Sequence, residues 1–165
     1  MIAVSSFRRL GLLCAALLLS ACANTPQLKN SDSTAESYWQ GKLSVKVYSS
    51  PVQAFAANFE LQGAATKGEL ILTSPLGTTL ARMRWIAGAA TLNANGAERH
   101  FDSLQTLAQQ VTGADIPVAS IFAWLQGIPE EAPGWKADLH DAGNGRISAQ
   151  HIEAVQAELK IILER

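Results

Sequence analysis

The sequence is poor in the residues that carry chemistry. Its 165 residues include three histidines, which stand far apart without a cysteine partner or helical pairing, so a zinc site has no support. No serine lies in a nucleophile-elbow pattern, and there is no glycine-rich phosphate loop. Neighbouring carboxylates fall in predicted loops, where they are usually solvated. We therefore expect a protein that is not an enzyme and that needs no cofactor or metal.

Charged residues are also scarce, at 16% of the chain, and neither sign dominates because 13 Lys and Arg stand against 14 Asp and Glu. A nucleic-acid-binding protein would show a basic excess, so we expect no nucleic-acid partner. Hydrophobic residues make up 48% of the chain. A chain of this length and composition can form one domain with its own core and still have apolar surface left over.

Cysteine is nearly absent, and both cysteines lie near the N-terminus. Two arginines precede an uncharged run at 10–19, which is too short to be a permanent bilayer span but fits a secretory signal. The run ends in Leu19-Ser20-Ala21-Cys22, which resembles the lipobox of bacterial lipoproteins. The resemblance implies cleavage before Cys22 and acylation of its sulfur and its new amine. The alternative is an ordinary signal peptide with a chance cysteine.

The segment after Cys22 predicts how the protein is anchored. In lipoproteins of this type an aspartate after the cysteine commonly signals retention in the inner membrane, whereas this chain has Ala23. The resemblance therefore implies sorting to the outer membrane, with a lipid anchor in its inner leaflet and the protein facing the periplasm. Residues 22–37 are polar and predict a flexible tether between a signal peptide at 1–21 and a domain at 38–165.

The first half of this domain predicts six antiparallel strands. Apolar and polar side chains alternate in 38–48, 54–62, the two halves of 67–85, 89–93 and 97–101. Asn95-Gly96 is the strongest short hairpin signal in the chain. Each strand has one apolar face, as in an antiparallel sheet that is packed on one side.

The second half changes period. Apolar residues recur at helical spacing in 104–111, after an N-cap at Asp102 or Ser103 and before Gly113, and again after Pro117, the favoured first helical position. Residues 135–140 predict a strand and 142–145 a turn. The last segment fits both a helix and a strand, and we predict a strand at 158–163 because the sheet needs a closing partner. The fold class is α+β, with the helices on one face of a sheet that curls into a partial barrel.

The turn at 74–78 carries a leucine where no core is in reach. Pro75 presets φ for the second position of the turn, and Gly77 allows positive φ. Burying a leucine is worth about 1.5–3 kcal/mol, so an exposed Leu76 favours contact with an apolar partner. The alternatives are that Leu76 folds back onto its hairpin or is one of the scattered apolar residues of any surface.

Several motifs together resemble one family. They are the lipobox, Trp39 with Gly41, the turn at 74–78, Val111-Thr112-Gly113, Ile116-Pro117-Val118 and Trp124-Leu125-Gln126-Gly127-Ile128-Pro129. This set is similar to the LolB family, the outer-membrane lipoprotein receptors of Gram-negative bacteria. The resemblance implies an incompletely closed antiparallel barrel, or half-barrel, in which two or three helices cover an apolar cavity. It also implies a monomer that takes lipoproteins from a LolA-type periplasmic carrier and places them in the outer membrane.

The resemblance assigns roles to particular residues. Leu76, flanked by Pro75 and Gly77, corresponds to the family's exposed leucine and is expected to dip into the bilayer. Acyl chains of the lipoprotein cargo would lie between the sheet and the helices. We expect the wall of that cavity to include Phe59, Leu61, Leu70, Leu72, Met83, Trp85 and Phe122. The alternative is that these residues form an ordinary core, as in a structural or assembly lipoprotein that binds proteins without handling lipid.

The chain departs from the family after Trp135, where about 30 residues follow and the family commonly runs longer. This departure predicts fewer strands and a shallower cavity.

Overall fold

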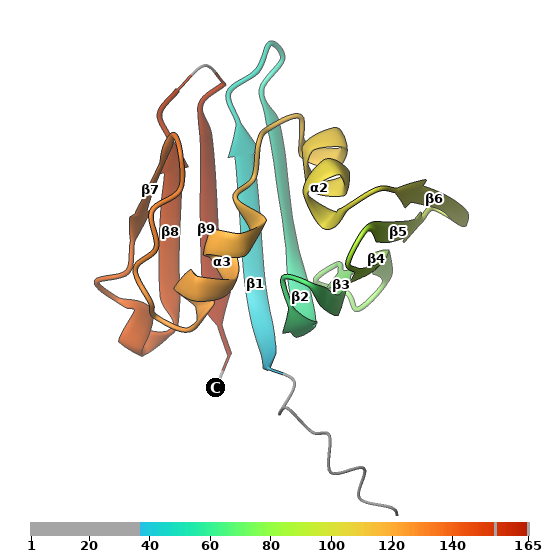
Figure 1. Ribbon diagram of the computed structural model, residues 1–165, viewed down its shortest axis with the longest axis horizontal. Coiled ribbons are helices and arrows are strands. Elements are labelled where there is room, and N and C mark those ends of the chain that lie inside the picture. Colours follow the sequence, from blue (N-terminus) through green and yellow to red (C-terminus); the bar gives the residue numbers. More distant parts are fainter. Residues whose placement is uncertain (1–36, 154, 165) are drawn as a thin grey trace, which may run out of the picture. The chain divides into compact units, whose positions relative to one another are not determined.

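The computed structural model describes residues 37–153 and 155–164 (Figure 1). These residues belong to the unit formed by 35–165. The predicted signal peptide, Cys22 and the predicted tether up to residue 36 lie outside the described residues. Neither helix in the described part of the chain is long and apolar enough to cross a membrane.

The described residues form a nine-stranded sheet in which every neighbouring pair is antiparallel. Its order is β6-β5-β4-β3-β2-β1-β9-β8-β7, with β6 and β7 at the two ends, so the sheet does not close into a barrel. The strands are β1 (Tyr38–Val47), β2 (Gln53–Ala64), β3 (Lys67–Thr73), β4 (Thr79–Ile86), β5 (Ala89–Ala94), β6 (Ala97–Phe101), β7 (Trp135–Asp138), β8 (Arg146–His151) and β9 (Ala157–Leu163). The six-strand meander and the incomplete barrel predicted from the sequence are confirmed.

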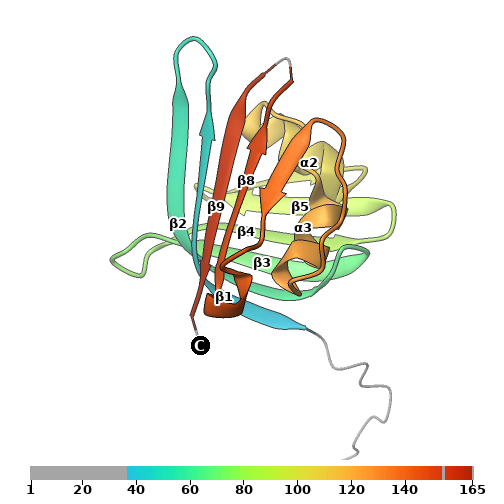
Figure 2. The same ribbon diagram turned by 90° about the vertical axis from the view of Figure 1, so that its left-hand side faces the viewer.

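One face of the sheet is apolar because the register aligns the inward-facing positions of neighbouring strands. Leu61 lies opposite Leu70, which lies opposite Met83 on the next strand. The helices α2 (Leu104–Thr112) and α3 (Val118–Leu125) lie over this face (Figures 1 and 2). Figure 2 also shows β3, β4 and β5 running across the direction of β1, β2 and β9, so the sheet is strongly curved around the helices.

Gly41 lies where the backbones of β1 and β9 approach closely. It is in the middle of three paired strands, opposite Phe59 of β2 and Leu163 of β9. Its φ is 155°, and a Cβ atom at this position would lie 2.0 Å from the backbone oxygen of Ile162. A side chain therefore cannot be accommodated without moving β1 and β9 apart.

The two helices form as their sequence signals predict, with one correction. The Oγ atom of Ser103 accepts a hydrogen bond from the backbone N–H of Thr106, and Gly113 ends α2 with φ 72°. These are the expected N-cap and C-cap. Pro117 is the N-cap of α3 rather than its first helical residue, and its φ of −80° still suits the start of a helix.

The C-terminal third of the domain was predicted less well. β9 is a strand, as expected, but β8 was missed, because its inward residues Ile147 and Ala149 are few and the residues after it fit helical spacing. β7 ends at Asp138 and not at residue 140, because the Oδ1 atom of Asp138 accepts a hydrogen bond from the N–H of His140 at 3.0 Å. The predicted turn at 142–145 contains the 3₁₀ helix η1 (Ala142–Asn144).

Candidate functional site: an apolar cavity and an exposed leucine

A cavity of about 450 Å³ lies between the concave face of the sheet and the two helices. Protein interiors are close-packed and contain few voids larger than a water molecule, so a space of this size is not ordinary core packing. All seven residues predicted for its wall line it, and six of them are buried while Leu70 is half-buried. They are Phe59, Leu61, Leu70, Leu72, Met83, Trp85 and Phe122.

The wall of the cavity has almost no polar groups. Among the described residues that line the cavity, the exceptions are Gln53, Thr112 and the indole N–H of Trp85. No described residue of the wall is charged. The Nε1 atom of Trp85 donates to the carbonyl oxygen of Ala64 at 2.8 Å, and the hydroxyl of Thr112 donates to that of Ala108 at 2.8 Å. Water needs two to four polar partners to be held, so this space suits a hydrocarbon chain better than water or a polar ligand.

The helix α3 is fixed over the cavity by aromatic contacts. Phe122 packs edge-on against Trp39 of β1, with ring centroids 5.9 Å apart, and against Trp85 of β4 at 6.3 Å. The Nε1 atom of Trp124 donates to the carbonyl oxygen of Glu130 at 2.9 Å. Another tryptophan, Trp135 of β7, donates from its Nε1 atom to the carbonyl oxygen of Asp115 at 2.9 Å. This hydrogen bond ties the segment between the two helices to the sheet.

The opening of the cavity lies between the start of β2 and the end of α2. Most residues of the wall are buried or half-buried, whereas Gln53, Ala54, Phe55 and Val111 are exposed. Phe55 and Val111 each keep 42% of their surface accessible. A hydrocarbon chain entering from this side would meet apolar side chains at the opening itself.

Sequence reasoning missed this opening, although part of the signal was present. Phe55 belongs to the same alternating pattern as Phe59 and Leu61, and Val111 belongs to the apolar stripe of α2. Periodicity assigned each of them to the apolar face. It could not show that the layers separate there and leave both side chains partly uncovered.

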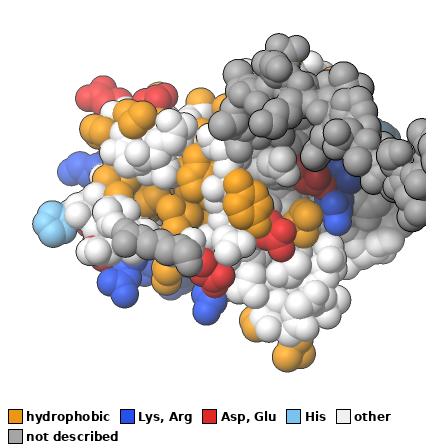
Figure 3. Space-filling model, turned by 90° about the horizontal axis from the view of Figure 1, so that it is seen from below, with side chains coloured by type: hydrophobic (Ala, Val, Ile, Leu, Met, Phe, Trp, Pro, Cys, Tyr) orange, Lys and Arg blue, Asp and Glu red, His pale blue; other side chains and the backbone are white. Residues whose placement is uncertain are grey.

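Leu76 lies at the tip of the β3–β4 hairpin and is 95% exposed. The other exposed large apolar residues of the described chain range from 40% to 58%, so Leu76 is distinct from them. Figure 3 shows hydrophobic side chains among charged ones on one face of the domain. Leu76 does not fold back onto its hairpin, and it does not line the cavity.

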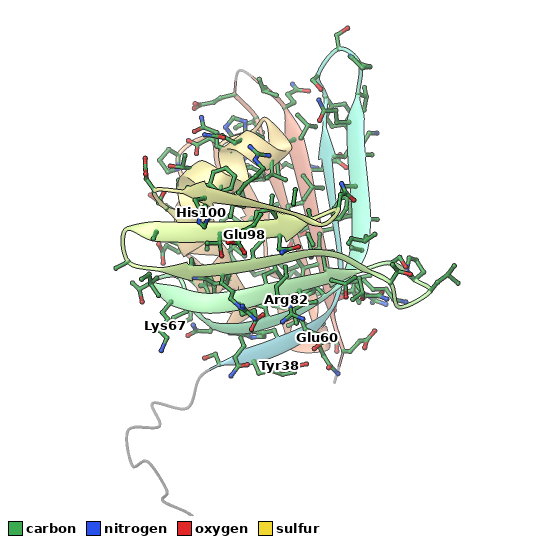
Figure 4. All side chains as sticks on the ribbon, turned by 90° about the vertical axis from the view of Figure 1, so that its right-hand side faces the viewer. Tyr38, Glu60, Lys67, Arg82, Glu98 and His100 are labelled. Carbon is green, nitrogen blue, oxygen red and sulfur yellow. The ribbon has the colours of Figure 1, made fainter. Side chains whose placement is uncertain are left out.

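The turn that carries Leu76 is held by its own hydrogen bonds. The N–H of Ser74 donates to the carbonyl oxygen of Thr78 at 2.8 Å, and the N–H of Gly77 donates to that of Ser74 at 2.9 Å. Gly77 has φ 83°, the positive value that the turn needs. Figure 4 shows this loop projecting beyond the sheet. The leucine is therefore presented outward by a defined turn.

The convex face of the sheet is polar, and Arg82 and Glu60 lie on it (Figure 4). Glu69 accepts hydrogen bonds from Arg84, which lies opposite it on β4, and from Arg82, which lies opposite Ile71. Burial alone would raise the pKa of Glu69, but the hydrogen bonds and charges of the two arginines outweigh it and hold the pKa below its usual value. The stabilisation from this group is therefore present above the ordinary carboxyl pKa and is lost as the pH falls through the lowered one.

Comparison with known proteins places this geometry in a family. The profile of the family described as Outer membrane lipoprotein LolB matches residues 37–159, which include β1 to β8, the start of β9, both helices and all residues of the cavity wall except Ile161. The chain belongs to the LolB family. The outer-membrane lipoprotein LolB of Chromobacterium violaceum is 30% identical over 154 residues, which cover 90% of this chain and 83% of that protein.

Two further LolB proteins show similar identity. The protein of Cupriavidus metallidurans is 33% identical over 146 residues, covering 84% of this chain and 71% of its own. The protein of Shewanella baltica is 31% identical over 123 residues, and the chain spans 56% of its length. Membership of the LolB family confirms the predicted family resemblance and the outer-membrane localisation. It also confirms that the protein is not an enzyme, because the family consists of lipoprotein receptors.

Proposed function

We propose that this protein is a lipid-anchored receptor that accepts lipoproteins from a LolA-type periplasmic carrier and inserts them into the inner leaflet of the outer membrane. The acyl chains of the cargo occupy the cavity during this transfer, and Cys22 carries the receptor's own lipid anchor. The observation that supports this most directly is the cavity of about 450 Å³, walled by apolar side chains and open at one side.

The energetics of the cavity suit a transfer step that uses no nucleotide. Removing one CH₂ group from water contributes about 0.8 kcal/mol, so ten buried methylenes contribute about 8 kcal/mol before the costs of binding. A tenfold difference in affinity corresponds to about 1.4 kcal/mol. A difference of two or three buried methylenes between carrier and receptor therefore suffices to make transfer directional.

The alternative function is that of a structural lipoprotein which binds other proteins and handles no lipid. Such a protein needs a filled core and uses a flat apolar patch on its surface. The hollow interior and the tip leucine, which is 95% exposed, favour the receptor instead.

Filling the cavity is expected to weaken lipid binding about tenfold or more. Ala81 on β4 is half-buried, lines the cavity and lies opposite Leu72 and Ala94. In Ala81→Trp the indole would occupy space that an acyl chain needs, at a cost in stability of about 1–3 kcal/mol. The measurement is displacement of an acyl-chain reporter dye by a synthetic lipopeptide. Ala87→Trp, at an exposed position in the β4–β5 turn, is the control.

If the parent protein binds no reporter dye, or if lipopeptide fails to displace it, the acyl-chain site is refuted. Equal displacement from Ala81→Trp and Ala87→Trp would place the lipid elsewhere.

Cys22→Ala is expected to remove the lipid anchor and shift the protein from the outer-membrane fraction to the soluble periplasm. Stable anchoring needs more than one acyl chain, and a chain without the cysteine sulfur cannot be diacylglycerated. The measurement is fractionation followed by detection of the protein. Continued association of Cys22→Ala with the outer membrane would contradict lipidation as the anchor.

A further inference from the structure

The first part of β2 is paired on one side only. Residues 53–57 pair with β1, from Gln53 opposite Val47 to Ala57 opposite Leu43. The pairing of β2 with β3 begins only at Asn58, opposite Thr73, because β3 turns away into the loop that carries Leu76. We call residues 53–57 the free edge. It is an unpaired strand edge on an internal strand of the sheet and not on one of the two terminal strands.

The register shows which backbone groups point outward from the free edge. The N–H of Gly63 donates to the carbonyl oxygen of Ser37, so odd-numbered residues of β2 form the hydrogen-bonded pairs with β1. The N–H and C=O groups of Ala54 and Ala56 consequently point away from β1. Neither residue has another hydrogen-bond partner within 37–153 and 155–164, and both are exposed.

The free edge lacks the protection seen at the two ends of the sheet. Edge strands are usually guarded by charged side chains, by proline or by being short. β6 carries Glu98, Arg99 and His100, and β7 has only four residues, among them Lys136 and Asp138. Gln53-Ala54-Phe55-Ala56-Ala57 has no charge and no proline. An added strand would therefore meet no charged side chain here, and no backbone N–H donor would be missing because of a proline.

The free edge coincides with the opening of the cavity, which Gln53, Ala54 and Phe55 also line. In a lipoprotein the acyl chains and the polypeptide leave from the same N-terminal cysteine. If the acyl chains enter the cavity, the residues that follow the cysteine must emerge at its opening. They therefore come within reach of Ala54 and Ala56.

We propose that the peptide segment directly after the acylated cysteine of the cargo pairs with the free edge of β2 as an added strand. This inference rests on the proposed function and names a second contact for the same ligand. Ala54 and Ala56 together offer two N–H donors and two C=O acceptors. Main-chain pairing does not depend on which side chains the added strand carries, so it suits cargo proteins whose sequences differ.

The first test is amide hydrogen exchange of the full-length lipidated protein in lipid nanodiscs. The probe is a synthetic diacylated cysteine followed by five uncharged residues, and palmitic acid is the comparison. The lipopeptide is expected to slow exchange at Ala54 and Ala56 at least tenfold, whereas palmitic acid is expected to leave both amides fast. Equal exchange with and without lipopeptide, under conditions where it displaces the reporter dye, overturns the proposal.

The second test compares two substitutions at Ala56. Ala56→Pro removes the outward N–H, and proline is tolerated at a strand position whose N–H is not used in the ladder. Ala56→Val keeps the N–H and has a side chain that suits a strand. Ala56→Pro is expected to weaken lipopeptide binding about tenfold and to leave palmitic acid binding unchanged, while Ala56→Val changes neither.

The outcomes separate this inference from the proposed function. If palmitic acid and lipopeptide both fail to bind the parent, the acyl-chain site itself is refuted. If both bind but Ala56→Pro weakens neither, the added strand is refuted alone.

A second probe covers the case in which Ala56→Pro does not fold. The same lipopeptide with N-methylated backbone amides is then tested on the parent protein, and binding as tight as that of the unmethylated probe overturns the proposal. Slow exchange of both amides before any probe is added would overturn the proposal and assign the edge to the protein's own N-terminal segment. If that protection from exchange rises with protein concentration, the edge is assigned instead to a second copy of the protein.

Discussion

Replacing Leu76 with glutamate is expected to stop delivery of lipoproteins to the outer membrane while the fold and the acceptance of cargo stay intact. The side chain is 95% exposed, so the substitution changes the free energy of unfolding by less than about 0.5 kcal/mol. It does not line the cavity, so we expect cargo binding not to depend on it. A carboxylate costs about 2.5–3.5 kcal/mol in the hydrocarbon of a bilayer, which corresponds to a loss of about 100-fold in membrane insertion of the tip.

The measurement is transfer of a labelled lipoprotein from carrier to receptor, followed by its appearance in outer-membrane vesicles. Ile86→Glu is the matched control, since Ile86 is also an exposed apolar residue but lies at the end of β4, away from the tip. Delivery by Leu76→Glu at the rate of the parent would remove the membrane role of the leucine. Loss of cargo acceptance along with delivery would show instead that the turn contributes to the binding site.

Replacing Gly41 with alanine is expected to destabilise the domain by about 3 kcal/mol or more. Its φ of 155° is a conformation that L side chains rarely adopt, and such strain costs about 1–3 kcal/mol on its own. The added Cβ atom would also lie 2.0 Å from the oxygen of Ile162, a backbone atom of a strand paired on both sides. Relief of this clash requires separation of β1 from β9, with loss of ladder hydrogen bonds.

The midpoint of urea unfolding measures this effect. Gly88→Ala is the control, because Gly88 also has positive φ, at 79°, but an added Cβ atom there meets nothing within 4 Å. The control is expected to lose about 1 kcal/mol. Similar midpoints for the two variants would mean that the crowding around Gly41 relaxes easily and does not constrain the sheet.

The N-terminal part of the domain could be predicted from the sequence because its signals are local. Alternation of apolar and polar residues fixes which side of a strand faces inward, and Asn95-Gly96 fixes one hairpin. The ends of α2 follow from Ser103 and Gly113 in the same way. Each of these signals depends on a few neighbouring residues, so no tertiary contact was needed to interpret it.

The remaining features depend on contacts between distant segments. β8 is held by pairing with β7 and β9, and its own pattern is too short to outweigh the helical spacing that follows it. Alternation predicts that the seven wall residues share one face, and the structure has them lining the cavity, but alternation cannot distinguish a filled interior from a hollow one. The free edge of β2 arises because β3 leaves the ladder after Thr73, and no residue of β2 signals that departure.

The two helices are attached to the sheet by different kinds of contact. Phe122 holds α3 between two tryptophans, and Trp135 holds the segment before it. The only polar contact that joins α2 to a strand, among the described residues, is the 3.4 Å hydrogen bond from Arg99 to Gln110, on the exposed surface. Apart from this bond α2 is held by apolar packing, with Leu107 only 1% exposed, and apolar contacts are not directional. If the cavity holds acyl chains as proposed, we therefore expect longer or more numerous chains to shift α2 along the sheet rather than α3.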